Sequence, residues 1–307
     1  MNTQCAAHVL MVRPSAFDFN PQTAVNNAFQ RPSEAGAALR RAAQQEFNGL
    51  VRLLRENGVE VLVLDDRPEP HTPDAVFPNN WISFHSNGTV VLYPMFAPNR
   101  RLERRPEVME RIRERYKVRT ILNLTEHELE VRFLEGTGSL VLDRKDHVAY
   151  ACLSERTDAA LVDRFCRKMG YRATTFHATD AQGRPVYHTN VMMSVGLRFA
   201  VVCLGSVRDA TERDALRLRL ERHGREVIDI DEGQMAAFAG NILQLRSADD
   251  SGLIVMSSRA HAAYRPEQLA RLEAHGRVIH TPLDTIEAHG GGSARCMIAE
   301  IFNPPLY

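Results

Sequence analysis

The residue best suited to nucleophilic chemistry is Cys296, which follows the glycine run 290–292 in the stretch GGGSARCMIAE near the C-terminus. Such glycines allow tight turns that point several backbone amides at one ligand. The thiolate is the reactive form of cysteine, and neighbouring N–H donors favour it. A buried structural thiol is the competing interpretation, which we prefer for Cys152, Cys166 and Cys203 because apolar or helical sequence surrounds them. The stretch alone leaves both interpretations open for Cys296.

Two further residues could assist a thiolate. His188 opens the segment VYHTNVMMSV, and an imidazole there could protonate a departing amine and later activate water. The chain contains 12 histidines, so any one of them is by default a structural or surface residue. Glu135 lies in LEGTGSLVL, just before a glycine turn, where a carboxylate can orient a histidine or bind a planar N–H group. We expect both residues at the site.

A third polar group is Asp74 with Asn79 and Asn80 in the segment PDAVFPNNW. Asparagine is frequent in turns because it tolerates left-handed backbone, so one asparagine alone would carry no functional meaning. Two adjacent asparagines before Trp81 weaken that explanation only modestly. We therefore keep all three residues as candidate substrate ligands.

The elements that must position these residues alternate between strands and helices. Strand-like apolar runs cover residues 9–12, 59–64, 89–95, 139–143, 191–195, 199–204, 241–245 and 252–258. Helical patterns cover residues 33–57, 104–117, 155–170, 208–223 and 265–275. The sequence therefore predicts an α/β protein, which we expect to form a single domain over residues 1–307.

A turn followed by an apolar strand recurs five times along the chain. The equivalent positions lie 58, 52, 51 and 54 residues apart, at Asn80, Gly138, Asn190, Asn241 and Arg295. Periods near 50 residues are typical of repeated architectures, and five such units could close into a ring with the turns at its centre. An ordinary doubly wound sheet is the alternative, although it would not by itself place polar turns at a constant interval.

The charge and cysteine content of the chain limit the kinds of ligand that it is expected to bind. Lysine plus arginine and aspartate plus glutamate both number 38, so no basic field attracts nucleic acid or an anionic membrane. The N-terminal apolar run is too short for a signal peptide or anchor, and we expect a soluble cytoplasmic protein. The five cysteines are scattered without metal-ligand spacing, so neither a disulfide framework nor a metal site is expected. A small-molecule substrate is the remaining expectation.

With these residues assembled, the sequence resembles the pentein superfamily of guanidino-group-modifying enzymes, which includes arginine deiminases, dimethylargininases and amidinotransferases. The resemblance rests on Cys296 after its glycines, on His188 opening a strand, on Glu135 in an EGTGS turn and on the PDAVF–NN segment. It implies a five-bladed, pseudo-symmetric α/β propeller with the active site at its axis. It also implies that Cys296, His188 and Glu135 are catalytic and that no cofactor is needed.

The resemblance extends to the groups that hold an amino-acid substrate. It implies that Arg101 in APNRR and Arg156 in LSERT bind the substrate carboxylate, a role that suits the two-pronged guanidinium. Asp74 is then expected near the substrate's α-amine. Taken alone, either arginine could equally be a solvent-facing charge. A homodimer is a further expectation.

One departure from the dimethylargininase pattern concerns the substrate. Asn79 and Asn80 stand where those enzymes carry an acidic pair. Enclosing a cationic guanidinium without carboxylate partners is costly, whereas carboxamides can meet a neutral ureido group. The segment is most similar to citrulline-utilising hydrolases, and we therefore expect hydrolysis of L-citrulline to ornithine, carbon dioxide and ammonia through an S-carbamoyl-cysteine. The alternatives are a guanidine-acting pentein, either a deiminase or an amidinotransferase, and a non-catalytic propeller that binds an amino acid.

Overall fold

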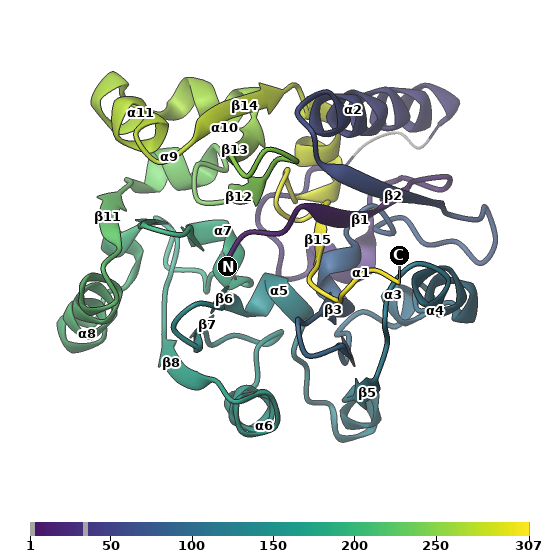
Figure 1. Cartoon of the computed structure of the whole chain (residues 1–307), viewed down its shortest axis with the longest axis horizontal. Coiled ribbons are helices and arrows are strands. Elements are labelled where there is room, and N and C mark those ends of the chain that lie inside the picture. The colour runs from purple at the N-terminus through teal and green to yellow at the C-terminus, as the bar shows by residue number, and fades with distance from the viewer. Residues whose placement is uncertain (1–3, 33–35, 307) are drawn as a thin grey trace.

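The chain folds into five three-stranded sheets around a central axis (Figure 1), as seen in a computed structural model that describes residues 4–32 and 36–306. The innermost strand of each sheet lies nearest the axis: β15 (Ala299–Ile301), β3 (Ile82–Phe84), β6 (Val141–Asp143), β9 (Met193–Val195) and β12 (Leu243–Arg246). The middle strands are β1 (His8–Arg13), β4 (Thr89–Leu92), β7 (Val148–Cys152), β10 (Phe199–Val202) and β13 (Gly252–Ser257). The outer strands are β2 (Glu60–Asp65), β5 (Thr120–Asn123), β8 (Arg172–Phe176), β11 (Glu226–Asp229) and β14 (Arg277–Thr281).

All five sheets share one pairing scheme. The middle strand pairs antiparallel with the inner strand and parallel with the outer strand. In β10, for example, Val201 lies opposite Ser194 on the inner side and Ile228 on the outer side. The C-terminal strand β15 joins the N-terminal strand β1, so the two ends of the chain complete one blade together. The predicted five-bladed α/β propeller is therefore confirmed.

A parallel pair of strands needs a crossover connection, and helices supply it on the rim of the ring (Figure 1). The helices that connect middle to outer strands are α2 (Ala37–Glu56), α3 (Pro98–Arg101), α4 (Pro106–Arg113), α6 (Ala159–Met169), α8 (Ala210–Arg222), α10 (Ser258–Ala263) and α11 (Pro266–Glu273). Helix α2 shows why they pack there, because its buried side chains recur at helical spacing on one face: Ala43, Phe47, Leu50, Val51 and Leu54. That face covers β1 and β2 and also contacts β14 of the neighbouring sheet.

Short helices and helical turns occupy the remaining connections. They are α1 (Pro21–Ala24), η1 (Pro78–Asn80), η2 (Thr125–Glu130), α5 (Gly136–Ser139), α7 (Thr189–Met192), η3 (Leu204–Ser206), α9 (Glu232–Ala236) and η4 (Ile286–Gly290). Three of them, η1, α5 and α7, immediately precede inner strands and carry the polar turns of the sequence repeat. The strand expected over residues 191–195 therefore begins only at Met193, because α7 takes the preceding residues.

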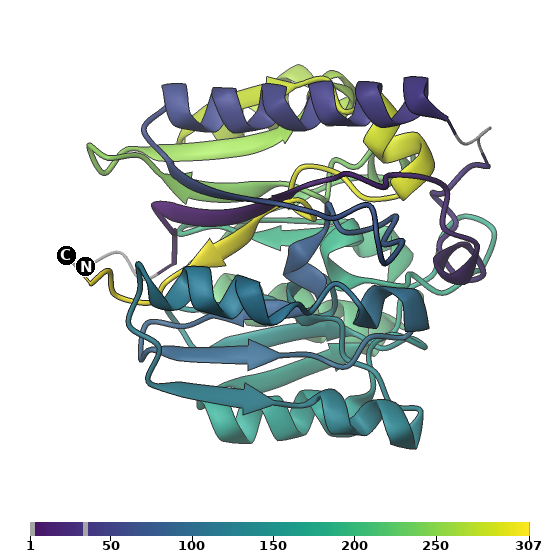
Figure 2. The ribbon, with the colours of Figure 1, turned by 90° about the vertical axis from the view of Figure 1, so that its right-hand side faces the viewer.

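The two ends of the axis differ. Figure 2 shows both chain ends at one end of the propeller and α1, in purple, at the opposite end. The helix expected over residues 33–57 is observed as α2. Residues 33–35 of the expected helix lie outside the described part of the chain. The same holds for residues 1–3 and 307 of the expected single domain. Within the described residues, no helix is both long and apolar enough to cross a membrane.

Candidate active site

Cys296 lies in the turn that precedes β15, and its side chain is only 3 % exposed. The glycines before it are required by packing. A Cβ atom at Gly290 would lie 2.8 Å from the ring of Phe77, and one at Gly292 would lie 2.9 Å from the same ring. Gly291 adopts a φ of +67°, which L side chains rarely adopt, and its carbonyl accepts a 2.6 Å hydrogen bond from the hydroxyl of Tyr187. The glycine run thus lets the loop fold closely around the thiol.

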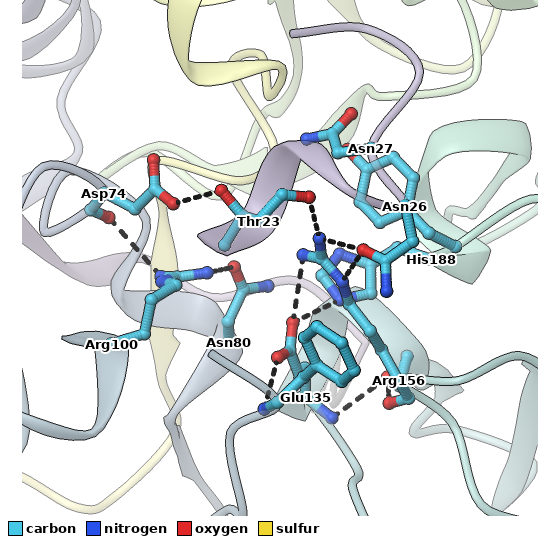
Figure 3. Close-up of polar contacts among 12 residues, drawn as sticks. Thr23, Asn26, Asn27, Asp74, Asn80, Arg100, Glu135, Arg156 and His188 are labelled. Atoms are coloured by element: carbon cyan, nitrogen blue, oxygen red, sulfur yellow. Dashed lines mark hydrogen bonds and ion pairs between the residues drawn. The ribbon is translucent and has the colours of Figure 1, made fainter. Parts of the chain in front are cut away.

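His188 stands at the start of α7, where its ring faces Glu135. The Nε2 atom of His188 lies 2.8 Å from Oε2 of Glu135, and both side chains are almost fully buried (Figure 3). A Cβ atom at Gly138 would lie 2.8 Å from Nδ1 of His188, so the EGTGS turn needs its second glycine to admit the imidazole. The other carboxylate oxygen of Glu135 accepts the backbone N–H of Phe96 at 2.9 Å.

The surroundings of Glu135 and His188 determine which of the two carries a proton. Burial is the largest influence on Glu135 and by itself raises its pKa, but Arg156 and the hydrogen bond from His188 together hold the pKa at about 2. Burial dominates for His188 and lowers its pKa to about 4, against the raising effect of Glu135. At neutral pH the carboxylate is therefore ionised and accepts the Nε2 proton of a neutral imidazole, which leaves Nδ1 free to accept a proton.

Arg156 is buried beside Glu135, with its guanidinium 3.5 Å from the Glu135 carboxylate. It donates to the carbonyl of Thr23 at 2.7 Å and, through Nε, to the side chain of Asn26 at 2.8 Å. Its guanidinium also lies 4.9 Å from the ring centroid of Tyr187, within reach of a cation–π interaction. Arg156 therefore joins the Glu135–His188 pair to the N-terminal segment around α1, as Figure 3 shows.

The structure brings Arg100, rather than Arg101, to the site. Arg100 is buried, forms a 2.8 Å ion pair with Glu103 and donates from Nη1 to Oδ1 of Asn80 at 2.7 Å. The side chain of Arg101 is 30 % exposed and lies outside the cavity, with its guanidinium 3.5 Å from Glu128. Both arginines end the short helix α3, where adjacent side chains point in different directions.

Asp74 lies on the opposite wall of the cavity from His188. Its Oδ2 atom accepts hydrogen bonds from Asn20 at 2.7 Å and from the hydroxyl of Thr23 at 3.0 Å. Its Oδ1 atom has no protein partner among the described residues, and burial raises the pKa of this carboxyl. Asp74 can therefore accept a hydrogen bond from a ligand.

The two predicted asparagines differ in position. Asn80 lines the cavity, and its Nδ2 atom has no partner among the described residues. Asn79 is completely buried outside the cavity wall, and neither of its side-chain polar atoms is paired within the described chain.

Most of these residues meet around one small cavity at the propeller axis. Its lining comprises Thr23, Asn27, Asp74, Phe77, Asn80, Arg100, Arg156, Tyr187, His188, Gly290, Gly291, Gly292 and Cys296. Glu135 stands behind His188 and Arg156 rather than in the wall. The cavity therefore combines a thiol, an imidazole, one free carboxylate oxygen and two arginines.

The model of the family described as N,N dimethylarginine dimethylhydrolase, eukaryotic, matches residues 13–303. The chain belongs to this family. It is accordingly a pentein, a member of the superfamily of guanidino-modifying enzymes that the sequence resembles. None of the curated proteins compared with it matches.

Solved structures share the fold of this family member at low sequence identity. ArgZ, an arginine dihydrolase from the ornithine-ammonia cycle in cyanobacteria, superposes with a TM-score of 0.76 and 19 % identity over 97 % of this chain and 41 % of ArgZ. AgrE in complex with L-arginine gives a TM-score of 0.73 and 20 % identity over 97 % of this chain and 40 % of AgrE. A dimethylarginine dimethylaminohydrolase adduct with S-methyl-L-thiocitrulline gives 0.65 and 16 % identity over 96 % of this chain and 99 % of that one. The chain thus spans about two fifths of ArgZ and AgrE.

Several site residues of this pentein were not anticipated from its sequence. The N-terminal segment supplies Thr23, Asn26 and Asn27, although only its unusual density of amide side chains in FNPQTAVNNAFQ could have indicated a role. Asn190 and Asn241 lie within hydrogen-bond distance of the Cys296 sulfur. Both had been identified only as equivalent points of the repeat. The arrangement as a whole can deliver a buried nucleophile, a proton acceptor and oriented donors to one small planar group.

Proposed function

We propose that the chain is a cysteine hydrolase that cleaves a C–N bond at the guanidino carbon of an arginine-type free amino acid. The observation that carries this proposal is that Cys296 and His188 line one buried cavity, with the ionised Glu135 held behind the imidazole. A thiol beside a neutral imidazole that is oriented by a carboxylate is the arrangement expected for covalent catalysis. Membership of the family supports a guanidino substrate rather than the citrulline first expected.

The proposed reaction proceeds in two halves. The thiol proton of Cys296 passes to His188, and the sulfur electron pair forms a bond to the guanidino carbon while the C=N π pair moves to nitrogen. The C–N bond to the leaving amine then breaks, and that nitrogen takes the proton from His188. Water next adds to the S-linked carbon and gives a proton to His188. The C–S bond breaks, its electron pair and the His188 proton return to sulfur, and the remaining hydroxyl proton is released as the ureido carbonyl forms.

The charges around the cavity support a cationic ligand. Three buried carboxyl groups, Asp74, Glu103 and Glu135, face two buried guanidinium groups, Arg100 and Arg156. An arginine zwitterion carries one net positive charge, which would balance this set when all three carboxylates are ionised. Burial raises the pKa of Asp74, and that of Glu103 to about 7, so a cationic ligand would have to stabilise their ionised forms. Buried charge is costly unless it is paired, so charge balance favours arginine over a neutral amino acid. The free Oδ1 atom of Asp74 is available for the substrate's α-ammonium group.

A second candidate, hydrolysis of the ureido group of citrulline, is favoured by the orientation of Asn80. Arg100 can only donate, so Oδ1 of Asn80 must face it and Nδ2 is the atom left for a ligand. An N–H donor suits the ureido oxygen and opposes a guanidinium, which presents only donors. In this candidate Cys296 attacks the ureido carbon, ornithine departs with a proton from His188, and water releases carbamate from the S-carbamoyl enzyme.

The two candidates predict different products from the purified chain. It should be incubated separately with arginine, N,N-dimethylarginine and citrulline while ammonia, dimethylamine, citrulline and ornithine are quantified. Citrulline formed from arginine or from dimethylarginine supports the guanidino proposal. Ornithine formed from citrulline, without turnover of arginine, supports the second candidate. The Cys296→Ser variant is the control, and undiminished turnover by it would contradict both.

A further inference from the structure

The sulfur of Cys296 has two side-chain amides as its polar neighbours. The Nδ2 atom of Asn241 lies 3.2 Å from Sγ, and the Nδ2 atom of Asn190 lies 3.4 Å from it. Both asparagines are buried, with 0 % and 1 % of their surfaces exposed. We propose that Asn241 is a catalytic residue that stabilises the Cys296 thiolate through its carboxamide N–H, with Asn190 as a second donor. This inference rests on the proposed function and deepens it.

The orientation of the Asn241 carboxamide is determined by the protein. Its Oδ1 atom accepts the backbone N–H of Arg295 at 3.1 Å, and its Nδ2 atom donates to the backbone carbonyl of Asn190 at 2.9 Å. A flipped amide would place its oxygen against that carbonyl and its N–H groups against the N–H of Arg295. The second N–H of Nδ2 must therefore be the group that faces Cys296.

A fixed donor favours the charged form of sulfur. A thiol sulfur accepts hydrogen bonds weakly, whereas a thiolate accepts charge-assisted bonds that are roughly twice as strong as neutral ones. Groups that hydrogen-bond the charged form of a titrating residue stabilise that form. Only 3 % of the Cys296 surface is exposed, and the two amides are hydrogen-bond donors that lie against the sulfur.

The carboxamide of Asn190 is held less firmly than that of Asn241. Its Oδ1 atom has no partner among the described residues, so only the sulfur orients its carboxamide. Its backbone carbonyl, in contrast, receives the Asn241 amide. The carboxamide of Asn241 is therefore held in the orientation that donates to Cys296. The carboxamide of Asn190 is free to rotate and can turn its N–H toward the sulfur when the thiolate forms.

The propeller symmetry explains why two asparagines meet at one atom. Asn190 and Asn241 occupy equivalent points of the five-fold sequence repeat, each on the turn that leads to an inner strand. Because inner strands converge on the axis, these turns converge as well (Figure 1). The third asparagine of the set, Asn80, instead accepts a hydrogen bond from Arg100. Asparagines at equivalent repeat positions thus have two different partners at the axis, the Cys296 sulfur and the Arg100 guanidinium.

Neither asparagine titrates, which makes their effect separable from that of the charged groups around the thiol. Those groups are Tyr187, His188, Asp74, Arg100 and Arg156 in the cavity wall and Arg295 next to Cys296 in the chain. Replacement of an asparagine removes none of these charges, and Asn190→Ala also keeps the hydrogen bond between Asn241 and the backbone of Arg295.

The test is the rate at which iodoacetamide alkylates Cys296 in the full chain, measured as a function of pH and located by peptide mass spectrometry. In Asn241→Ala the pH of half-maximal rate should rise by about one unit, which equals about a tenfold loss of thiolate at pH well below the midpoint. Asn303→Ala is the matched control, because Asn303 is equally buried and makes two backbone hydrogen bonds, to His85 and Lys117, away from the site. Its midpoint should equal that of the unmodified protein.

If Asn241→Ala does not fold, Asn190→Ala carries the test, because it removes an N–H from the sulfur and keeps the carbonyl that holds Asn241. A smaller upward shift is expected there. A folded variant of either residue with an unchanged midpoint overturns the inference. The assay uses no substrate, so a shifted midpoint in a protein that turns over no amino acid would refute the proposed function and leave this inference standing.

Discussion

Replacing Asn80 with aspartate should change the substrate preference, because it converts the free donor in the cavity wall into an acceptor. The oxygen that accepts from Arg100 at 2.7 Å is retained, and the second carboxylate oxygen takes the place of Nδ2. A guanidinium N–H gains a partner and a ureido oxygen loses one. An unmet or opposed buried polar group costs about 1–3 kcal/mol, so each substrate should change by about 5- to 150-fold, in opposite directions.

The measured quantity is the ratio of kcat/KM for arginine to kcat/KM for citrulline. This ratio is independent of the fraction of folded enzyme, so a loss of stability in Asn80→Asp does not affect it. Asn27→Asp is the matched control, because Asn27 also lines the cavity but has its hydrogen bonds with the backbone of Gly291 and Phe29. A general effect of added negative charge would move both variants equally. An unchanged ratio in Asn80→Asp, or a shift toward citrulline, would refute the orientation argument.

Three further predictions concern Glu135, His188 and Arg156. Glu135→Gln should lower kcat about 10- to 150-fold, because it replaces a charge-assisted hydrogen bond to His188 worth about 1.5–3 kcal/mol; steady-state kinetics with an unchanged kcat would contradict this role. Burial lowers the pKa of His188 to about 4, below the 6.5 of an exposed histidine, so the unfolded chain binds a proton that the folded chain does not. The free energy of unfolding should therefore fall as the pH drops from about 6.5 to 4. Over this range the melting temperature should depend less on pH in His188→Gln than in the unmodified protein, whereas replacement of the exposed His71 by Gln should leave the dependence unchanged. Arg156→Lys should raise KM more than it lowers kcat, because an ammonium cannot reproduce the fork held by Asn26 and Thr23; an unaffected KM would show that Arg156 does not help to bind substrate.

The ring was predictable from the sequence, whereas most of the outer strands were not. The period of the polar turns that precede the inner strands predicted the ring. The outer strand β2 was also expected, at residues 59–64, but the buried middle strand β7 was missed. The outer strands β5, β8 and β11 are largely exposed on the rim and read TILN, RATTF and EVID, without an apolar run or strict alternation. They form because a parallel neighbour offers backbone partners, which is a tertiary effect that local patterns do not contain.

The candidate site shows a similar division. Residue chemistry made Cys296, His188 and Glu135 candidates, and the resemblance to the pentein superfamily decided the interpretation of Cys296. The structure places Cys296 and His188 in the wall of one cavity, with Glu135 behind His188. Spacing could not distinguish Arg100 from Arg101, because the direction of adjacent side chains depends on how α3 sits against the propeller. Thr23, Asn26 and Asn27 come from an N-terminal segment that is far from the other site residues in the chain, so local patterns could not place them at the site.

The central claim is that Cys296 forms a covalent bond to the substrate carbon. The most direct measurement is to mix the enzyme with arginine, dimethylarginine or citrulline, quench it in acid within the first turnovers and map the adduct by peptide mass spectrometry. The account predicts that one of these substrates adds an amidino-type or carbamoyl group to the peptide that contains Cys296, and that Cys296→Ser shows none. Turnover with no adduct on Cys296, or an adduct on another residue, would contradict it.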